Sequence, residues 1–119
     1  MSMSKLISYL LSSAAAEFGD SLAKRLSTLY PVALDKPGAK KVSANRMASI
    51  LERLYADARS YRHAHHLGYI GRARMSHAFK WRLLEIGYSK EFIDMATEGL
   101  VVYLYKPKTG TSPEKAASK

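Results

Sequence analysis

The chain has 119 residues, 47% of them apolar and 24% charged, which is the composition of one globular domain with a single core. Its 19 Lys and Arg outnumber its 10 Asp and Glu, so the net charge is +9. The absence of cysteine excludes disulfides, thiolate catalysis and Cys-ligated metal, and no apolar stretch reaches the length of a transmembrane helix.

The first predicted element is a helix over residues 4–29, which ends before Pro31 because proline cannot continue the helical hydrogen-bond ladder. Lys5 and the apolar run after it loosely imitate a secretory signal peptide. The apolar stripe, however, keeps its helical period past the would-be cleavage point, so we interpret the segment as a core helix and expect a cytoplasmic protein. Gly19 and Asp20 mark a point where this helix can break or kink. The stripe consists of Ile7, Leu11, Ala14, Phe18, Leu22, Leu26 and Leu29.

Residues 31–42 contain two prolines, a glycine and three lysines, which predicts a mobile, basic connector. A second helix is expected from the N-cap candidates Ser43 or Asn45 to about His66, with one apolar face and arginines on the others. Residues 67–71 then form a second connector, whose two glycines allow unusual backbone angles. The apolar face of the second helix comprises Met47, Ile50, Leu51, Leu54, Ala58 and Tyr61.

A third helix is expected over about residues 72–86, with Gly87 at its C-terminal end, and a fourth helix begins after the N-cap Ser89. Residues 100–105 have the β-branched and aromatic content of a strand. No partner strand is evident elsewhere, so we interpret them as an extension of the fourth helix.

The last segment, residues 106–119, contains no large apolar side chain, which predicts a disordered basic tail. The preceding residues, 1–105, are predicted to form the folded part of the chain. The fold prediction is therefore all-α: a single small helical domain of about four helices, followed by that tail.

The positive charge is concentrated in the middle of the chain. Residues 36–82 contain eleven Lys or Arg and only two acidic residues, so this stretch alone carries a net charge of +9. The fourth predicted helix is acidic by contrast. Such asymmetry is typical of a chain that binds a polyanion.

The third predicted helix carries the most specific signal. Its buried face is formed by apolar residues at spacings of three and four: Met75, Phe79, Leu83 and Ile86. Its other sides carry cations and the only tryptophan of the chain: Arg74, His77, Lys80, Trp81 and Arg82. A planar aromatic ring among arginines suits stacking on an unpaired base while the arginines hold phosphates. The competing interpretation is that Trp81 packs against another helix or a subunit.

Three histidines follow one another closely at the end of the second predicted helix: His63, His65 and His66. None of them is four residues from another, which is the spacing that brings helical metal ligands together. We therefore expect solvated or phosphate-facing histidines and no metal site.

The segment LLEIGYSKEFIDMAT, residues 83–97, places a glycine turn between two helices. It resembles the corner of helix-turn-helix motifs and also that of ubiquitin-associated domains. The second helix of this corner carries Glu91, Asp94 and Glu98, the wrong sign of charge for a DNA major groove. We interpret the segment as an ordinary helical corner.

The sequence contains no P-loop, dinucleotide fingerprint, HExxH or Gly-x-Ser-x-Gly motif. Carboxylates are few, and none is paired with a histidine at helical spacing. We expect neither enzymatic activity nor a cofactor.

These patterns predict a non-catalytic nucleic-acid-binding protein that contacts the backbone of RNA or DNA through a basic face on the second and third helices. It would act as a regulator or as a small subunit of a nucleoprotein complex, and its acidic and cationic segments could also stack into a homo-oligomer. The alternative is an adaptor that docks an acidic protein through the same face. A membrane-surface role is less favoured, because no large apolar surface lies beside the cations. The candidate contact residues are Lys40, Lys41, Arg46, Arg53, Arg59, Arg62, Arg72, Arg74, His77, Lys80, Trp81 and Arg82.

Overall fold

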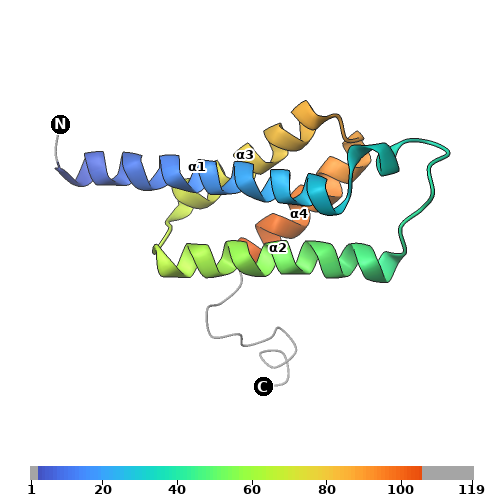
Figure 1. Ribbon diagram of the computed structural model, residues 1–119. Helices are drawn as coiled ribbons and strands as arrows, with labels where there is room; N and C mark the ends of the chain where they lie inside the picture. The colour runs from blue at the N-terminus through green and yellow to red at the C-terminus, as the bar shows by residue number, and fades with distance from the viewer. Residues whose placement is uncertain (1–2, 106–119) are drawn as a thin grey trace, which may run out of the picture.

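The computed structural model describes residues 3–105, which form four α-helices and one short 3-10 helix and contain no strand (Figure 1). The prediction of an all-α fold of about four helices is confirmed. None of the described helices is long and apolar enough to cross a membrane. The predicted tail lies outside the described residues. The elements are α1 (Met3–Leu29), η1 (Val32–Asp35), α2 (Ala44–Ala64), α3 (Tyr69–Ile86) and α4 (Lys90–Leu104).

Each α-helix packs on two others, so the four helices surround a common core. α1 packs most extensively on α3 and more lightly on α2, whereas α4 packs on both α2 and α3. Consecutive helices α2 and α3 therefore lie on a diagonal of the arrangement and hardly touch (Figure 1). The largest fully buried side chains are Leu22, Leu26, Leu54, Met75, Phe79, Leu83, Leu100 and Leu104.

The helix ends follow the local signals in the sequence. The side-chain oxygens of Ser43 and Ser89 accept backbone N–H bonds three residues onward, at 3.1 and 3.2 Å, and so cap α2 and α4. Gly87 ends α3 with a φ of 111°, a left-handed conformation that residues with a Cβ rarely adopt. Residues 100–104 continue α4 as helix, as predicted.

α1 is continuous through Gly19 and Asp20, where the sequence allowed a break. Gly19 is buried where α1 crosses α3, and a Cβ built on it would lie only 2.2 Å from the backbone oxygen of Met75. The glycine therefore serves the close approach of two helices. Asp20 caps no helix and instead accepts a hydrogen bond from Arg82 of α3.

Two segments predicted as connectors are partly helical. The predicted mobile connector contains η1, and the carboxylate of Asp35 anchors it by accepting the Ser89 backbone N–H at 2.6 Å. In the second connector, α3 begins at Tyr69, three residues earlier than expected. Gly71 is buried inside α3, so its role is packing rather than a turn.

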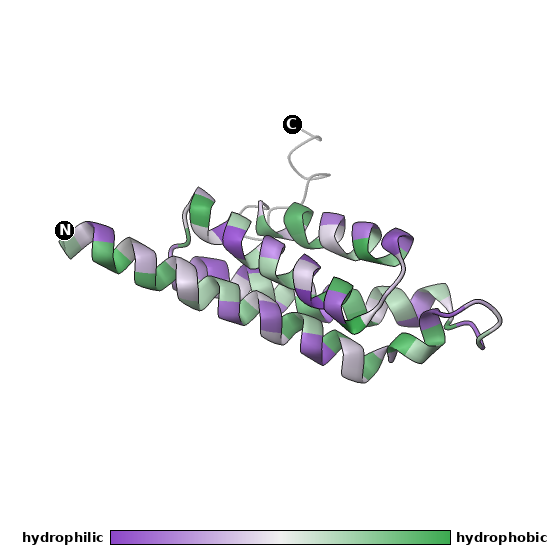
Figure 2. Cartoon of the chain, turned by 90° about the horizontal axis from the view of Figure 1, so that it is seen from above, coloured by the Kyte–Doolittle hydropathy of each residue, from purple (hydrophilic) through white to green (hydrophobic). Residues whose placement is uncertain are grey.

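The apolar stripe predicted for α1 is only partly buried. Leu22 and Leu26 are fully buried, but Ile7 and Leu11 are 50% and 40% exposed, and Leu29 at the C-terminal end is 40% exposed. Ile7 and Leu11 are exposed because the first turns of α1 extend beyond the ends of the other helices (Figures 1 and 2). Periodicity identifies an apolar side of a helix, but it does not say how far the partner helix reaches.

Candidate nucleic-acid interface

The outward side of α3 carries the residues that the sequence placed there. Arg74, His77, Lys80 and Trp81 are all exposed, and we call these four residues the α3 ridge. The opposite side of the same helix is buried against α1 and α4. Because positions 74, 77 and 81 are separated by three and four residues, their side chains follow one line along the helix surface.

Trp81 is held by a neighbour on its own helix. Its Nε1–H donates a hydrogen bond to Nε2 of His77, and the two rings meet edge to face, with centroids 5.7 Å apart. This bond requires a neutral imidazole with its proton on Nδ1. Trp81 is nevertheless 50% exposed. About half of the surface of this oriented residue is thus open to a ligand.

The two cations of the α3 ridge are Arg74 and Lys80. Within the described part of the chain, the side chains of Arg74 and Lys80 form neither a hydrogen bond nor an ion pair. The charge of Lys80 does act on α4, where the hydrogen bond from Lys90 chiefly, and the charge of Lys80 to a smaller extent, lower the pKa of Asp94. Cations without a carboxylate partner retain their charge for an external anion.

Arg82 lies at the edge of this surface but is already engaged. It forms ion pairs with Asp20 of α1 and, at 3.1 Å, with Glu85. The hydrogen bond from Arg82 lowers the pKa of Asp20, and the same bond raises the pKa of Arg82. As a candidate phosphate contact Arg82 therefore differs from the α3 ridge, because it joins α3 to α1.

A second group of candidates gathers where α2 and α3 meet the end of α4. Arg62 donates to the backbone oxygen of Leu104, and the guanidinium of Arg72 lies 4.5 Å from the centroid of the Tyr105 ring. Arg59 lies over the Tyr103 ring at 5.7 Å. Burial, with a contribution from the charge of Arg72, lowers the pKa of Arg62.

Arg62 thus binds a carbonyl at the negative end of the α4 dipole, and Arg59 and Arg72 lie over two tyrosine rings that were not candidates from the sequence. Their only sequence signal was the aromatic content of residues 100–105.

The remaining candidates lie before α2 and along its first half. Lys40 and Lys41 are exposed in the connector that precedes α2, and Arg46 and Arg53 are exposed on the helix itself. Since α2 and α3 hardly touch, these four cations form a group separate from the α3 ridge. Eleven of the twelve candidates therefore fall into three groups rather than one continuous face on α2 and α3, and the twelfth, Arg82, is engaged between α3 and α1.

The histidines at the end of α2 interact with their own surroundings. The ring of His65 stacks on Tyr61 with centroids 4.1 Å apart, and its Nδ1 lies 3.1 Å from the Tyr61 backbone oxygen. His63 is half-buried. No three metal-ligating side chains come together among residues 3–105.

The chain matches no protein-family model, no curated protein and no solved structure.

Proposed function

We propose that this protein binds nucleic acid without catalysis, and that the α3 ridge is its principal contact surface. In this proposal Arg74 and Lys80 hold backbone phosphates while the exposed part of Trp81 stacks on an unpaired base. The arginines and lysines of the other two groups add attraction that is independent of sequence.

The observation that carries the proposal is the half-exposed tryptophan on the same helix side as two cations that form no ion pair within the described residues. Tryptophan is usually well buried, so a half-exposed and oriented indole is more informative than a basic residue alone. The net charge of +9 supports the same class of partner. Regulator and nucleoprotein subunit are both consistent with these features. The cytoplasmic location and the stacking of α4 on the cationic block of a neighbour remain predictions.

The test is a titration with labelled single-stranded RNA, single-stranded DNA and duplex DNA over a range of salt. Because Trp81 is the only tryptophan, its fluorescence reports on the α3 ridge directly. We expect quenching by single strands but not by duplex. We also expect log affinity to fall linearly with log salt, by about 0.7 units of slope for each phosphate contacted in a single strand.

The matched variants carry equal changes of charge. Arg74→Glu with Lys80→Glu should lower the affinity for single strands by on the order of 100-fold. Lys115→Glu with Lys119→Glu changes the net charge by the same amount outside the described residues, and it should lower affinity by much less. Equal losses in the two pairs, or no binding to any of the three polymers at low salt, would contradict the proposal.

The alternative is an adaptor that docks an acidic protein through the same ridge. The observation in its favour is Leu84, which is 50% exposed on the same side of α3, one turn beyond Trp81, and has no use in binding a backbone. Leu84→Ala separates the two functions. It should leave the affinity for single-stranded RNA unchanged if the surface binds nucleic acid, and it should weaken a protein partner for which Leu84 is an anchor.

A further inference from the structure

The first three turns of α1 form an unusual surface. They extend beyond the other helices, yet within residues 3–16 the only charged side chain is Lys5 (Figures 1 and 2). The second half of α1 is ordinary by comparison, with Leu22 and Leu26 buried and Lys24 exposed. A helix segment that exposes this much apolar surface with so little charge is normally covered by a partner.

Exposed apolar residues from α3 adjoin these turns. Tyr69 and Ile70, in the first turn of α3, are 69% and 66% exposed. Together with α1 they make a patch that we call the apolar end, whose eight side chains are between 40% and 71% exposed. It consists of Met3, Leu6, Ile7, Tyr9, Leu10, Leu11, Tyr69 and Ile70.

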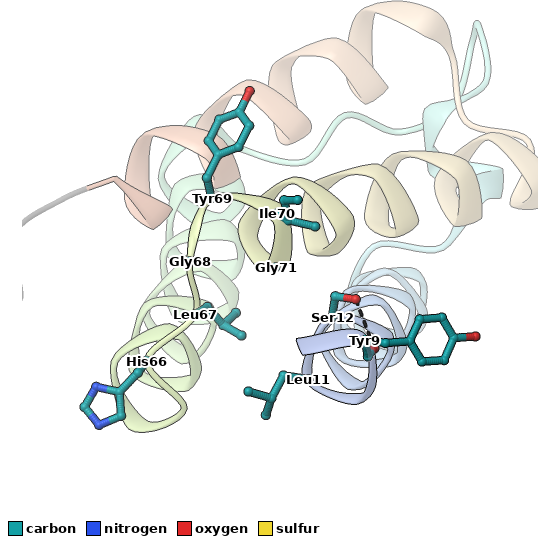
Figure 3. A pocket seen from close by; sticks show the side chains of 9 residues that line it. All are labelled: Tyr9, Leu11, Ser12, His66, Leu67, Gly68, Tyr69, Ile70 and Gly71. Carbon is teal, nitrogen blue, oxygen red and sulfur yellow. Dashed lines mark hydrogen bonds between the residues drawn. The ribbon is translucent and has the colours of Figure 1, made fainter. Parts of the chain in front are cut away.

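A hollow of ≈ 480 Å³ lies within this patch, between α1 and the loop that joins α2 to α3. Leu11, Leu67 and Ile70 extend into the space between the two segments, while the Tyr69 and Tyr9 rings point outward (Figure 3). The molecule therefore presents a projecting apolar helix and an apolar hollow side by side.

Such an arrangement is self-complementary. A two-fold rotation can place the projecting turns of each copy over the hollow of the other, which is the geometry of an isologous dimer. Contact through these exposed apolar side chains in both copies suits a standard protein interface, to which each partner contributes about 800 Å².

Charge also favours a second copy over other occupants. Two chains of net charge +9 repel each other, so they can meet at low cost only where charge is sparse, as it is between residues 3 and 16. A nucleic acid or an anionic membrane would instead need several cations at this surface. We propose that two copies of this chain associate through the apolar end, with α1 of each copy seated in the hollow of the other.

The test is the mass of the full chain by light scattering over a dilution series, in high salt and without nucleic acid, so that its outcome is independent of the proposed function. The wild-type protein should show twice 13.3 kDa and dissociate on dilution. Ile7→Gln with Leu10→Gln should raise the dissociation constant about 100-fold, since each loss occurs twice in a two-fold interface. Glutamine is a good helix former, so the helix itself should persist, which circular dichroism checks.

The matched control is Met95→Gln with Val102→Gln on α4. These residues are 45% and 58% exposed, against 50% and 56% for Ile7 and Leu10, but they lie outside the apolar end. The control should dimerise like the wild type. A wild-type mass of 13.3 kDa at every concentration would overturn the proposal, as would equal behaviour of the two double variants. Binding of a monomeric wild type to phosphatidylcholine vesicles would overturn it as well, and would assign the surface to lipid.

Discussion

The inner and outer faces of α3 belong to one helix of eighteen residues, but the inner face contributes to the core and the outer face is exposed to solvent. On the inner face, Met75, Phe79 and Leu83 are 0–1% exposed and fill the core. On the outer face, the four residues of the α3 ridge are exposed, and within residues 3–105 none of them forms an ion pair. Arg82 lies between them, and its ion pairs place it with the inner face. The comparison teaches that cations with the same charge differ in whether they can bind an external anion, because some of them already form ion pairs with carboxylates.

The largest difference between the two faces should appear on truncation of an aromatic residue. Phe79→Ala leaves a cavity in the core and should lower the free energy of unfolding by about 3–5 kcal/mol. Trp81→Ala on the outer face should change it by much less, about 0.5 kcal/mol, since this residue is half exposed and its ring contacts His77 on its own helix. Urea denaturation followed by circular dichroism measures both. Comparable losses would mean that Trp81 belongs to the core.

A smaller effect should follow from adding one methyl group where α1 crosses the inner face. Gly19→Ala places a Cβ 2.2 Å from the Met75 oxygen, and a backbone atom cannot move aside as a side-chain end can. We expect a net loss of about 1–3 kcal/mol, despite the gain in helix propensity. Gly68→Ala, whose Cβ meets nothing within 4 Å, should cost less than about 1 kcal/mol in the same denaturation assay. A stable Gly19→Ala protein would show that the two helices can separate freely.

The smallest expected effect is a difference in acid stability between a variant of Arg82 and a variant of Arg74. The hydrogen bond from Arg82 holds the pKa of Asp20 below its ordinary value of 3.8. Such a carboxylate stabilises the fold above the unfolded-state pKa, and the contribution is lost as the pH falls through the folded-state pKa. The free energy of unfolding should therefore decline below about pH 3.8, less steeply in Arg82→Gln than in the wild type.

The control for this measurement is Arg74→Gln, which removes a cation without a carboxylate partner. It should keep the acid profile of the wild type, because no described carboxylate depends on it. An unchanged profile in Arg82→Gln would show that the bond to Asp20 does not contribute to stability in solution.

Much of the fold could be predicted because its signals are local. Ser43, Ser89 and Gly87 sit at helix ends, where the backbone itself needs a capping oxygen or a left-handed residue. The two faces of α3 also followed from residue spacing alone. The start of α3 at Tyr69 was missed, because glycine is as suited to a turn as to the tight packing that Gly71 actually provides.

The candidate site was predicted less completely. Exposure of the α3 ridge followed from periodicity, but the engagement of Arg82 did not, because Asp20 is 62 residues away in sequence. The same holds for Arg62, which binds a backbone oxygen 42 residues away. Contacts over such separations depend on which helices pack together, and no local pattern encodes that choice.

By itself, the sequence determined the type, number and approximate limits of the helices, the buried sides of α2, α3 and α4 and the excess of positive charge, because these depend on neighbouring residues. Only the tertiary structure decided which cations are available and which hold helices together. It also placed α2 and α3 on a diagonal, which divides the cationic stretch into three groups, and left the first turns of α1 uncovered. The physical reason is that burial and ion pairing depend on which two helices pack together, whereas periodicity is a property of a single helix.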